Sequence, residues 1–290
     1  MIIVQILIIL ISLAAIGWMI HYAWKIEPNN IENTSYDVVS DALPTELEGL
    51  RLCQVSDVHL TGFPRNADAI AKAIRSVEAD LYLFTGDMIH RQAGIPAFLE
   101  WLDNLGKHIL PAIAVLGNAE HKSHVQNQSL LEGLAHRKIP ILTNETLLFL
   151  IKDAAIQIVG VDDPHTNHED FQKAFANTNP SLFTLLLCHS PDGVTELAGH
   201  RVDLMLCGHT HGGQIRFPIV GAIAQNTKRV YGLAWGWYRG AELTRKAKCE
   251  VGRTQLYVSR GLGMSRLGLR INCRPELTVF TLRRKAPTTS

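Results

Sequence analysis

Six short apolar runs, each ending at a small or polar residue, set the strongest limit on how this chain can fold. They lie at 50–57, 80–87, 111–118, 155–163, 183–190 and 202–209. Runs of this length, several of them rich in β-branched residues, predict buried β-strands. Helix-like stretches at 66–79, 95–105, 121–137 and 191–200 lie between several of these runs. The alternation predicts an α/β fold whose sheets are covered by helices.

The polar residues gather where the predicted strands end. They are Asp57, His59, Asp87, Asn118, His189, His209 and His211. Because open α/β folds place their sites at the carboxyl ends of strands, we expect these side chains to meet at one edge. Each residue alone could be an ordinary turn former, but turn chemistry has no reason to select imidazole four times. Imidazole with carboxylate and amide oxygen, without thiolate, suits two divalent ions such as Mn, Fe, Zn or Co.

The first 24 residues are apolar and contain no Lys, Arg, Asp or Glu. About twenty such residues cross a bilayer, and Trp18, Tyr22 and Trp24 stand where interfacial aromatic residues occur. No Lys or Arg precedes the run, which favours a retained transmembrane anchor over 1–24 rather than a cleaved signal peptide. A buried core helix is the other alternative. Lys25, which follows the run, favours a single-pass protein of the cell membrane with its catalytic domain on the cytoplasmic side.

The remaining chain divides by composition. Residues 25–48 are polar and contain Pro28 and Pro44, which predicts a linker with at most one short strand at its end. A single domain is expected over 49–285. Within it, the stretches 254–261 and 277–285 predict hairpin strands, and no clear helix is expected beyond residue 213.

The net charge of +1 hides an asymmetry along the chain. Residues 216–290 contain 15 Lys and Arg but 3 Asp and Glu, a balance of +12, which leaves −11 on residues 1–215. Near a membrane, such a basic surface would face anionic headgroups or anionic substrates. No nucleic-acid module is evident, so nucleic acid is not an expected partner, and no protein partner is inferred. Five cysteines, an odd number, give no disulfide framework.

Five motifs in order, "SDVHL", "TGDMI", "LGNAEH", "CHSPD" and "CGHTHGG", resemble those of the calcineurin-like binuclear metallophosphoesterases. The later stretch "QLYVSRGLGMSRLGLRINCRPELTVFTL" is similar to the membrane-associated branch of that superfamily. The resemblance covers about residues 49–283. It implies a four-layer α-β-β-α sandwich, here preceded by the transmembrane helix, with two divalent metals at one edge, Mn favoured. A hydroxide held between the metals would attack phosphorus in a phosphodiester or pyrophosphate.

The resemblance also implies which residues hold each metal. The first metal would be bound by Asp57, His59, Asp87 and His211, and the second by Asp87, Asn118, His189 and His209. Asp87 would bridge the two ions. In an extended segment His209 and His211 would point the same way, because they are two residues apart. The glycines on either side of them would let the backbone bend beside the ions.

One position departs from the family pattern. Where the family commonly has Gly-Asn-His, this chain has Gly117, Asn118 and Ala119, so a histidine credited with stabilising the transition state or protonating the leaving group is missing. His121 is the catalytic candidate in its place. A nucleotide phosphate leaves without a proton more readily than an alkoxide does, which favours a pyrophosphate substrate. Members of the superfamily that hydrolyse UDP-2,3-diacylglucosamine in lipid A biosynthesis also replace this histidine. The predicted substrate is therefore anionic and lipid-linked.

Arg260 and Arg274 lie in the basic region and, with Asn118, are candidates for binding substrate phosphate. An ordinary surface role for each arginine is the alternative. Two other functions stay open: a broad-specificity phosphodiesterase or phosphatase of the same family, and a non-catalytic scaffold with the same fold. Because all seven ligand types are present, the sequence favours an enzyme.

Overall fold

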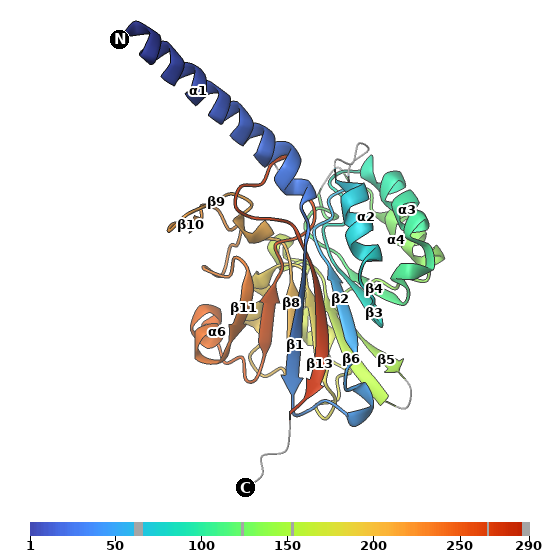
Figure 1. Cartoon of the computed structure of the whole chain (residues 1–290). Helices are drawn as coiled ribbons and strands as arrows, with labels where there is room; N and C mark the ends of the chain where they lie inside the picture. Colours follow the sequence, from blue (N-terminus) through green and yellow to red (C-terminus); the bar gives the residue numbers. More distant parts are fainter. Residues whose placement is uncertain (61–65, 123–124, 152–153, 266, 286–290) are drawn as a thin grey trace.

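Two sheets face each other at the centre of the molecule (Figure 1). The computed structural model describes residues 1–60, 66–122, 125–151, 154–265 and 267–285. One sheet has the strand order β1 (Glu32–Ser40), β13 (Glu276–Arg284), β2 (Arg51–Val55), β3 (Leu81–Thr85) and β4 (Ala112–Val115). The other has the order β11 (Gly236–Arg239), β12 (Gln255–Val258), β8 (Leu204–Cys207), β7 (Thr184–Cys188), β6 (Ala154–Val161) and β5 (Glu145–Ile151). All six predicted apolar runs form strands of these sheets.

Helices cover the outer face of each sheet. On the five-stranded sheet lie α2 (Ala67–Arg75), α3 (Gly94–Leu105) and α4 (Gln128–His136), and on the six-stranded sheet α5 (Phe171–Phe175) and α6 (Gly240–Ala247). Buried apolar residues form three clusters, one under each helix layer and one between the sheets. Strand β7 serves two of them, because Leu185 points between the sheets and Leu186 points toward α5. The molecule is therefore the expected four-layer α-β-β-α sandwich.

The C-terminal third differs from the expectation of hairpins without a helix. Strand β12 pairs with β8 and β11, whereas β13 lies between β1 and β2 in the opposite sheet. Helix α6 was not expected, because it is short and highly charged and buries only Leu243 and Ala247. The stretch 191–200 contains a 3-10 helix, Pro191–Glu196, in place of the expected helix-like segment.

The polar segment 25–48 contains an edge strand. Strand β1 pairs in parallel with β13 over nine residues. Its burial alternates, and only Val38 and Ser40 are buried, so the strand is polar in composition. Polar residues are typical of an edge strand, where they oppose pairing with other chains.

Helix α1 (Ile2–His21) projects away from the sandwich and buries none of its residues (Figure 1). The helical stretch from Ile2 to Asn29 is long and apolar enough to cross a membrane. Its last turns form a π-helix, Tyr22–Ile26, and a 3-10 helix, Glu27–Asn29, in which Glu27 and Pro28 are buried against the domain.

A buried arginine organises the loop between β12 and β13. Arg270 is 0% exposed, and its guanidinium donates to the main-chain oxygens of Gly263 (2.6 Å), Arg260 (2.8 Å) and Cys273 (3.1 Å). Because these oxygens belong to three separate residues between β12 and β13, the arginine holds together a loop that packs against Asp57.

We expect Arg270→Met to lower the free energy of unfolding by about 3 kcal/mol, because it leaves several buried carbonyls without a donor. The melting temperature in detergent should fall by roughly 6 to 12 °C. Arg253→Met is the matched control, since the half-exposed Arg253 pairs with Asp41 at the surface and should contribute under about 1 kcal/mol. Equal effects of the two changes would contradict this role for Arg270.

Candidate metal centre

The seven predicted ligands follow the carboxyl ends of five strands. Asp57 and His59 follow β2, Asp87 follows β3 and Asn118 follows β4, whereas His189 follows β7 and the pair His209 and His211 follows β8. Strands β2 to β4 are parallel within one sheet, and β7 and β8 are parallel within the other. The face-to-face arrangement of the sheets therefore brings loops from both to one edge.

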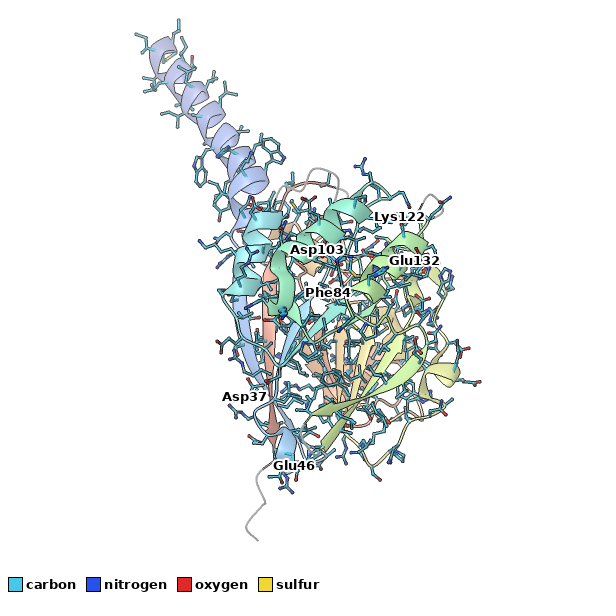
Figure 2. All side chains as sticks on the ribbon, turned by 90° about the vertical axis from the view of Figure 1, so that its right-hand side faces the viewer. Asp37, Glu46, Phe84, Asp103, Lys122 and Glu132 are labelled. Atoms are coloured by element: carbon cyan, nitrogen blue, oxygen red, sulfur yellow. The ribbon has the colours of Figure 1, made fainter. Side chains whose placement is uncertain are left out.

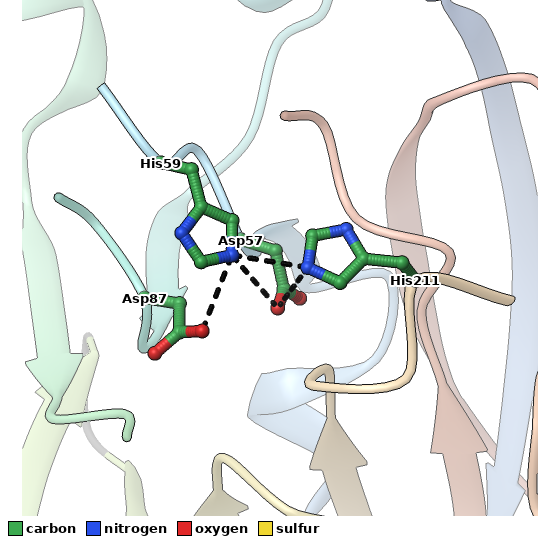
Figure 3. Close-up of side chains that lie close together, drawn as sticks. All are labelled: Asp57, His59, Asp87 and His211. Atoms are coloured by element: carbon green, nitrogen blue, oxygen red, sulfur yellow. Dashed lines mark hydrogen bonds and ion pairs between the residues drawn. The ribbon is translucent and has the colours of Figure 1, made fainter. Parts of the chain in front are cut away.

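Four of these side chains form a compact buried group, shown in Figure 3. Ligand atoms of Asp57, His59, Asp87 and His211 all lie within 4.8 Å of one another. The two Nε2 atoms of His59 and His211 are 3.0 Å apart. His59 Nε2 lies 3.2 Å from Asp87 Oδ2, and His211 Nε2 lies 3.4 Å from Asp57 Oδ1. Two imidazoles and two carboxylates that point inward at one place form a donor set suited to a divalent cation.

Burial and the neighbouring His59 hold the pKa of His211 well below its ordinary value. The ring is therefore neutral near pH 7, which is the form that binds metal ions. Burial alone would raise the pKa of Asp87, but the adjacent His189 and His59 hold it well below its ordinary value. The carboxylate is therefore charged.

The other three predicted ligands, His189, His209 and Asn118, have buried atoms without hydrogen bonds on the far side of Asp87. His189 Nδ1 lies 2.8 Å from the carbonyl of Thr85, and His209 Nε2 lies 2.8 Å from the carbonyl of Asn226. Because a carbonyl only accepts, these two nitrogens carry protons. Burial lowers the pKa of His209 to about 3, so its Nδ1 keeps a lone pair. Burial would also lower the pKa of His189, but the charge of Asp87, whose Oδ1 lies 3.3 Å from His189 Nε2, raises it. His189 Nε2, His209 Nδ1 and Asn118 Oδ1 are buried without a hydrogen-bond partner in the described part of the chain. Such orphaned atoms fit a cation that these residues would hold.

Asp87 stands between the two groups of ligands. Its Oδ2 faces His59, and its Oδ1 lies 3.3 Å from His189 Nε2 and accepts from the N–H of Ala119 at 2.7 Å. A single carboxylate thus contacts both groups, which is the position that a bridging ligand requires.

The backbone is strained at five of the seven predicted ligands. Positive φ angles occur at Asp57 (52°), His59 (48°), Asp87 (51°), His209 (70°) and His211 (51°). Non-glycine residues seldom adopt this region, and clusters of them mark functional sites. The expected extended conformation of 209–211 is wrong, because Thr210 is right-handed helical between two left-handed histidines. Strand β8 ends at Cys207, and the chain then turns tightly over Asp57.

Glycines permit this close approach. A Cβ built on Gly208 would lie 2.2 Å from Asp57 Oδ2, and one built on Gly117 would lie 2.4 Å from Asp87 Oδ1. Any side chain at either position would collide with a ligand carboxylate.

Sequence reasoning missed Glu120. This buried carboxylate accepts from the N–H groups of Gly117 (2.8 Å), Asp87 (3.0 Å) and Ile89 (3.1 Å). Burial and the charge of Asp87 raise the pKa of Glu120 to about 7. The sequence signal that could have identified Glu120 is its position directly after the "GNA" motif. In the structure, its carboxylate joins the loop after β4 to the loop after β3.

His121 has an acidic partner that the sequence did not predict. Its Nε2 lies 2.6 Å from Asp162 Oδ1, and its ring stacks on His168 with centroids 3.9 Å apart. Burial alone would lower the pKa of His121, but the hydrogen bond and charge of Asp162 raise it. The catalytic role of His121 stays a prediction.

The two predicted phosphate-binding arginines have protein partners. Arg260 is buried, bonds Glu276 at 2.7 Å and Glu32 at 2.9 Å, and lies over the ring of Trp235. Arg274 donates to the carbonyl of Asn30 at 3.0 Å. Two carboxylates already neutralise Arg260, so its role in substrate binding also stays a prediction.

Comparison with known proteins agrees with this geometry. A model of the calcineurin-like phosphoesterase family matches residues 50–213. The metallophosphoesterase YkuE of Bacillus subtilis is 32% identical over 277 residues, which cover 90% of this chain and 89% of YkuE. The phosphodiesterase YaeI of Escherichia coli is 31% identical, with 79% of this chain and 80% of YaeI covered. The UDP-2,3-diacylglucosamine pyrophosphatase LpxG of Chlamydia muridarum is 27% identical, with 88% and 89% covered. From its matched residues and these relatives, the chain belongs to the calcineurin-like phosphoesterase family and is a hydrolase of phosphoric esters or anhydrides.

Proposed function

We propose that the chain is a membrane-anchored phosphoesterase that uses two divalent metals, Mn favoured, to hydrolyse a phosphodiester or pyrophosphate bond in a lipid-linked substrate such as UDP-2,3-diacylglucosamine. The position of Asp87 is the observation that carries the proposal. One of its oxygens faces His59 and the other faces His189, so two groups of inward-pointing donors share one carboxylate. A lone cation would leave the second group of buried atoms without a partner.

The chain's own residues divide the work at this site. Asp57, His59, Asp87 and His211 would hold one ion, and Asp87, Asn118, His189 and His209 the other. The pair of ions would supply Lewis acidity for the attack of water on phosphorus. Thr85 and Asn226 fix the ring orientations of His189 and His209 through their carbonyls. His121, protonated with the help of Asp162, is the candidate donor of a proton to the leaving group.

Three features support a lipid-linked pyrophosphate as the substrate. Helix α1 could hold the domain at a bilayer, with Lys25 favouring its cytoplasmic side. Ala119 stands where the family commonly has a histidine that could protonate the leaving group. A nucleotide phosphate needs that proton less than an alkoxide does. LpxG, a relative with this substrate in its name, aligns over 88% of the chain.

The test uses the full-length protein in detergent with Mn. We expect two bound metals per chain by elemental analysis and hydrolysis of an aryl phosphodiester. UDP-2,3-diacylglucosamine should be cleaved at least about tenfold faster than an alkyl phosphodiester, a difference of about 1.4 kcal/mol at the transition state. Equal rates for these two substrates would contradict the leaving-group argument, and the absence of both metal and turnover would favour a scaffold.

A broad-specificity phosphodiesterase is the second candidate. YaeI, which is named a phosphodiesterase, is 31% identical to this chain. If the alkyl and aryl diesters are hydrolysed as fast as the UDP-lipid, this candidate replaces the first.

A further inference from the structure

We propose that an apolar pocket beside His209 and His211 holds an acyl chain of the phosphate lipid while the phosphate lies at the metal centre. This inference rests on the proposed lipid-linked substrate and names the part of the chain that recognises the lipid. It concerns the turn after β8, the short hairpin β9 (Arg216–Phe217) and β10 (Gly221–Ala222), and the junction with α1.

The pocket has a volume of about 300 Å³ and shares the two histidines with the metal centre. Its remaining wall is largely apolar and includes Ile215, Ile223 and Leu267. The amide of Gln214 is used within the wall, since it donates to the Leu267 carbonyl at 2.6 Å and accepts from the Ser265 N–H at 3.0 Å. The volume is at the lower end for ligand sites, which suits one part of a lipid rather than the whole molecule.

The hairpin beside the pocket exposes an apolar tip. Phe217, Val220 and Ile223 are exposed, and Ile219 is exposed completely. Ile219 also has a φ of 71°, which is costly for a β-branched residue. Because Ile223 belongs to both the tip and the pocket wall, the apolar surface runs from the tip into the pocket. Contiguous exposed apolar surface of this kind marks a contact with a membrane or ligand.

The hairpin is bonded to the base of α1. Ile271 accepts from the N–H of Arg216 at 2.9 Å, and the next residue back, Arg270, donates its N–H to the carbonyl of Ala23 at 2.9 Å. Cys273 donates its N–H to the buried Glu27, and its Sγ lies 3.3 Å from the carbonyl oxygen of His211. The helical segment, the hairpin and His211 are thus linked through residues 270–273. If a bilayer surrounded α1, these links would keep the hairpin and the mouth of the pocket close to the bilayer surface.

Charge agrees with a phospholipid as the occupant. Lys25 lies in the π-helix that follows α1, where it could face anionic headgroups. Arg216 adds positive charge at the root of the hairpin, although its guanidinium donates to the carbonyl of Gly212 at 2.8 Å. With its metals bound, the centre would be cationic, and His209 and His211 place it next to the apolar wall of the pocket. A ligand with an anionic phosphate joined to an apolar chain satisfies both surfaces, whereas a soluble nucleotide would leave the apolar wall exposed to water.

The test uses the full-length protein in phosphatidylcholine vesicles that contain a phosphatidic acid with a photoreactive diazirine in its acyl chain. We expect crosslinks, mapped by mass spectrometry, on residues 215–224 as well as on α1. Crosslinks confined to α1 would overturn the proposal, because the lipid would then contact only the helix.

Two substitutions sharpen this test. Ala224→Phe narrows the pocket, and Ile223→Ser removes apolar surface at an exposed position where folding is not at risk. Each should reduce crosslinking of the hairpin about tenfold, an effect of about 1.4 kcal/mol. Leu150→Ser is the matched control, because Leu150 on β5 is a comparably exposed apolar residue outside the pocket and should change nothing. A similar loss in all three variants would overturn the proposal.

Hydrolysis measured on the same preparations separates this inference from the proposed function. Turnover of an aryl phosphodiester without hairpin crosslinks would overturn the acyl-chain pocket and leave the phosphoesterase in place. Hairpin crosslinks without hydrolysis of any lipid phosphate would support the pocket and contradict the lipid substrate.

Discussion

Asp87→Asn is expected to remove both metals from the protein and to abolish hydrolysis. The substitution preserves shape, and its Oδ1 can still accept from the N–H of Ala119, so the loop should keep its path. It removes the negative charge that lies between His59 and His189. Loss of a residue that only supports a metal ligand already lowers metal affinity 10- to 100-fold. Loss of Asp87, which would bind both ions, should therefore lower metal affinity by more than about a hundredfold.

Metal content and turnover measured together test this expectation. Asp203→Asn is the matched control, since Asp203 is an equally buried aspartate of the same sandwich that bonds Ser40 and the N–H of Thr184. The control should keep two metals and full activity. An Asp87→Asn protein that still binds two metals would contradict the bridging position. Thermal stability gives a second measurement, because ions that bind only the folded state raise the melting temperature.

The sheets could be predicted because their strands end at chemically distinct residues. The runs that precede Asp87 and His189 are mostly apolar and then stop at a polar residue, which is typical of buried parallel strands. Strands β1 and β13 were harder to place. Their pairing joins the two ends of the domain in sequence, from Glu32 to Arg284, and local patterns contain no information about such distant partners.

That Asp57, His59, Asp87 and His211 meet at one edge could be predicted, but the local geometry could not. The spacing of His209 and His211 suggested an extended chain, whereas the structure has a tight turn with left-handed residues. The packing of Gly208 against the Asp57 carboxylate, and the bond from the His209 N–H to that carboxylate, hold the turn in place. Similarly, the basic composition around Arg260 suggested a phosphate site, but the acids that neutralise it, Glu32 and Glu276, come from opposite ends of the domain.

Glu120→Gln is the second change with a large expected effect. Three N–H groups, of Gly117, Asp87 and Ile89, converge on the two oxygens of this carboxylate. Glutamine has one acceptor oxygen, so its NH₂ group would face at least one of these donors. Such an unmade buried bond costs about 1–3 kcal/mol, and it would displace the loops that position Asp87 and Asn118. We expect a 10- to 100-fold loss of metal affinity, the range for outer partners of metal ligands.

Metal titration of purified Glu120→Gln measures this loss. Glu132→Gln is the control, because the exposed Glu132 on α4 (Figure 2) accepts only from Gln128 in the described structure. Glu120→Asp separates charge from reach, since aspartate keeps both oxygens but is one methylene shorter. If the carboxylate acts by joining the two loops, aspartate should restore part of the affinity that glutamine loses. If the Glu120→Gln protein binds metal as tightly as the native protein does, other contacts hold the two loops, and Glu120 has no part in positioning Asp87.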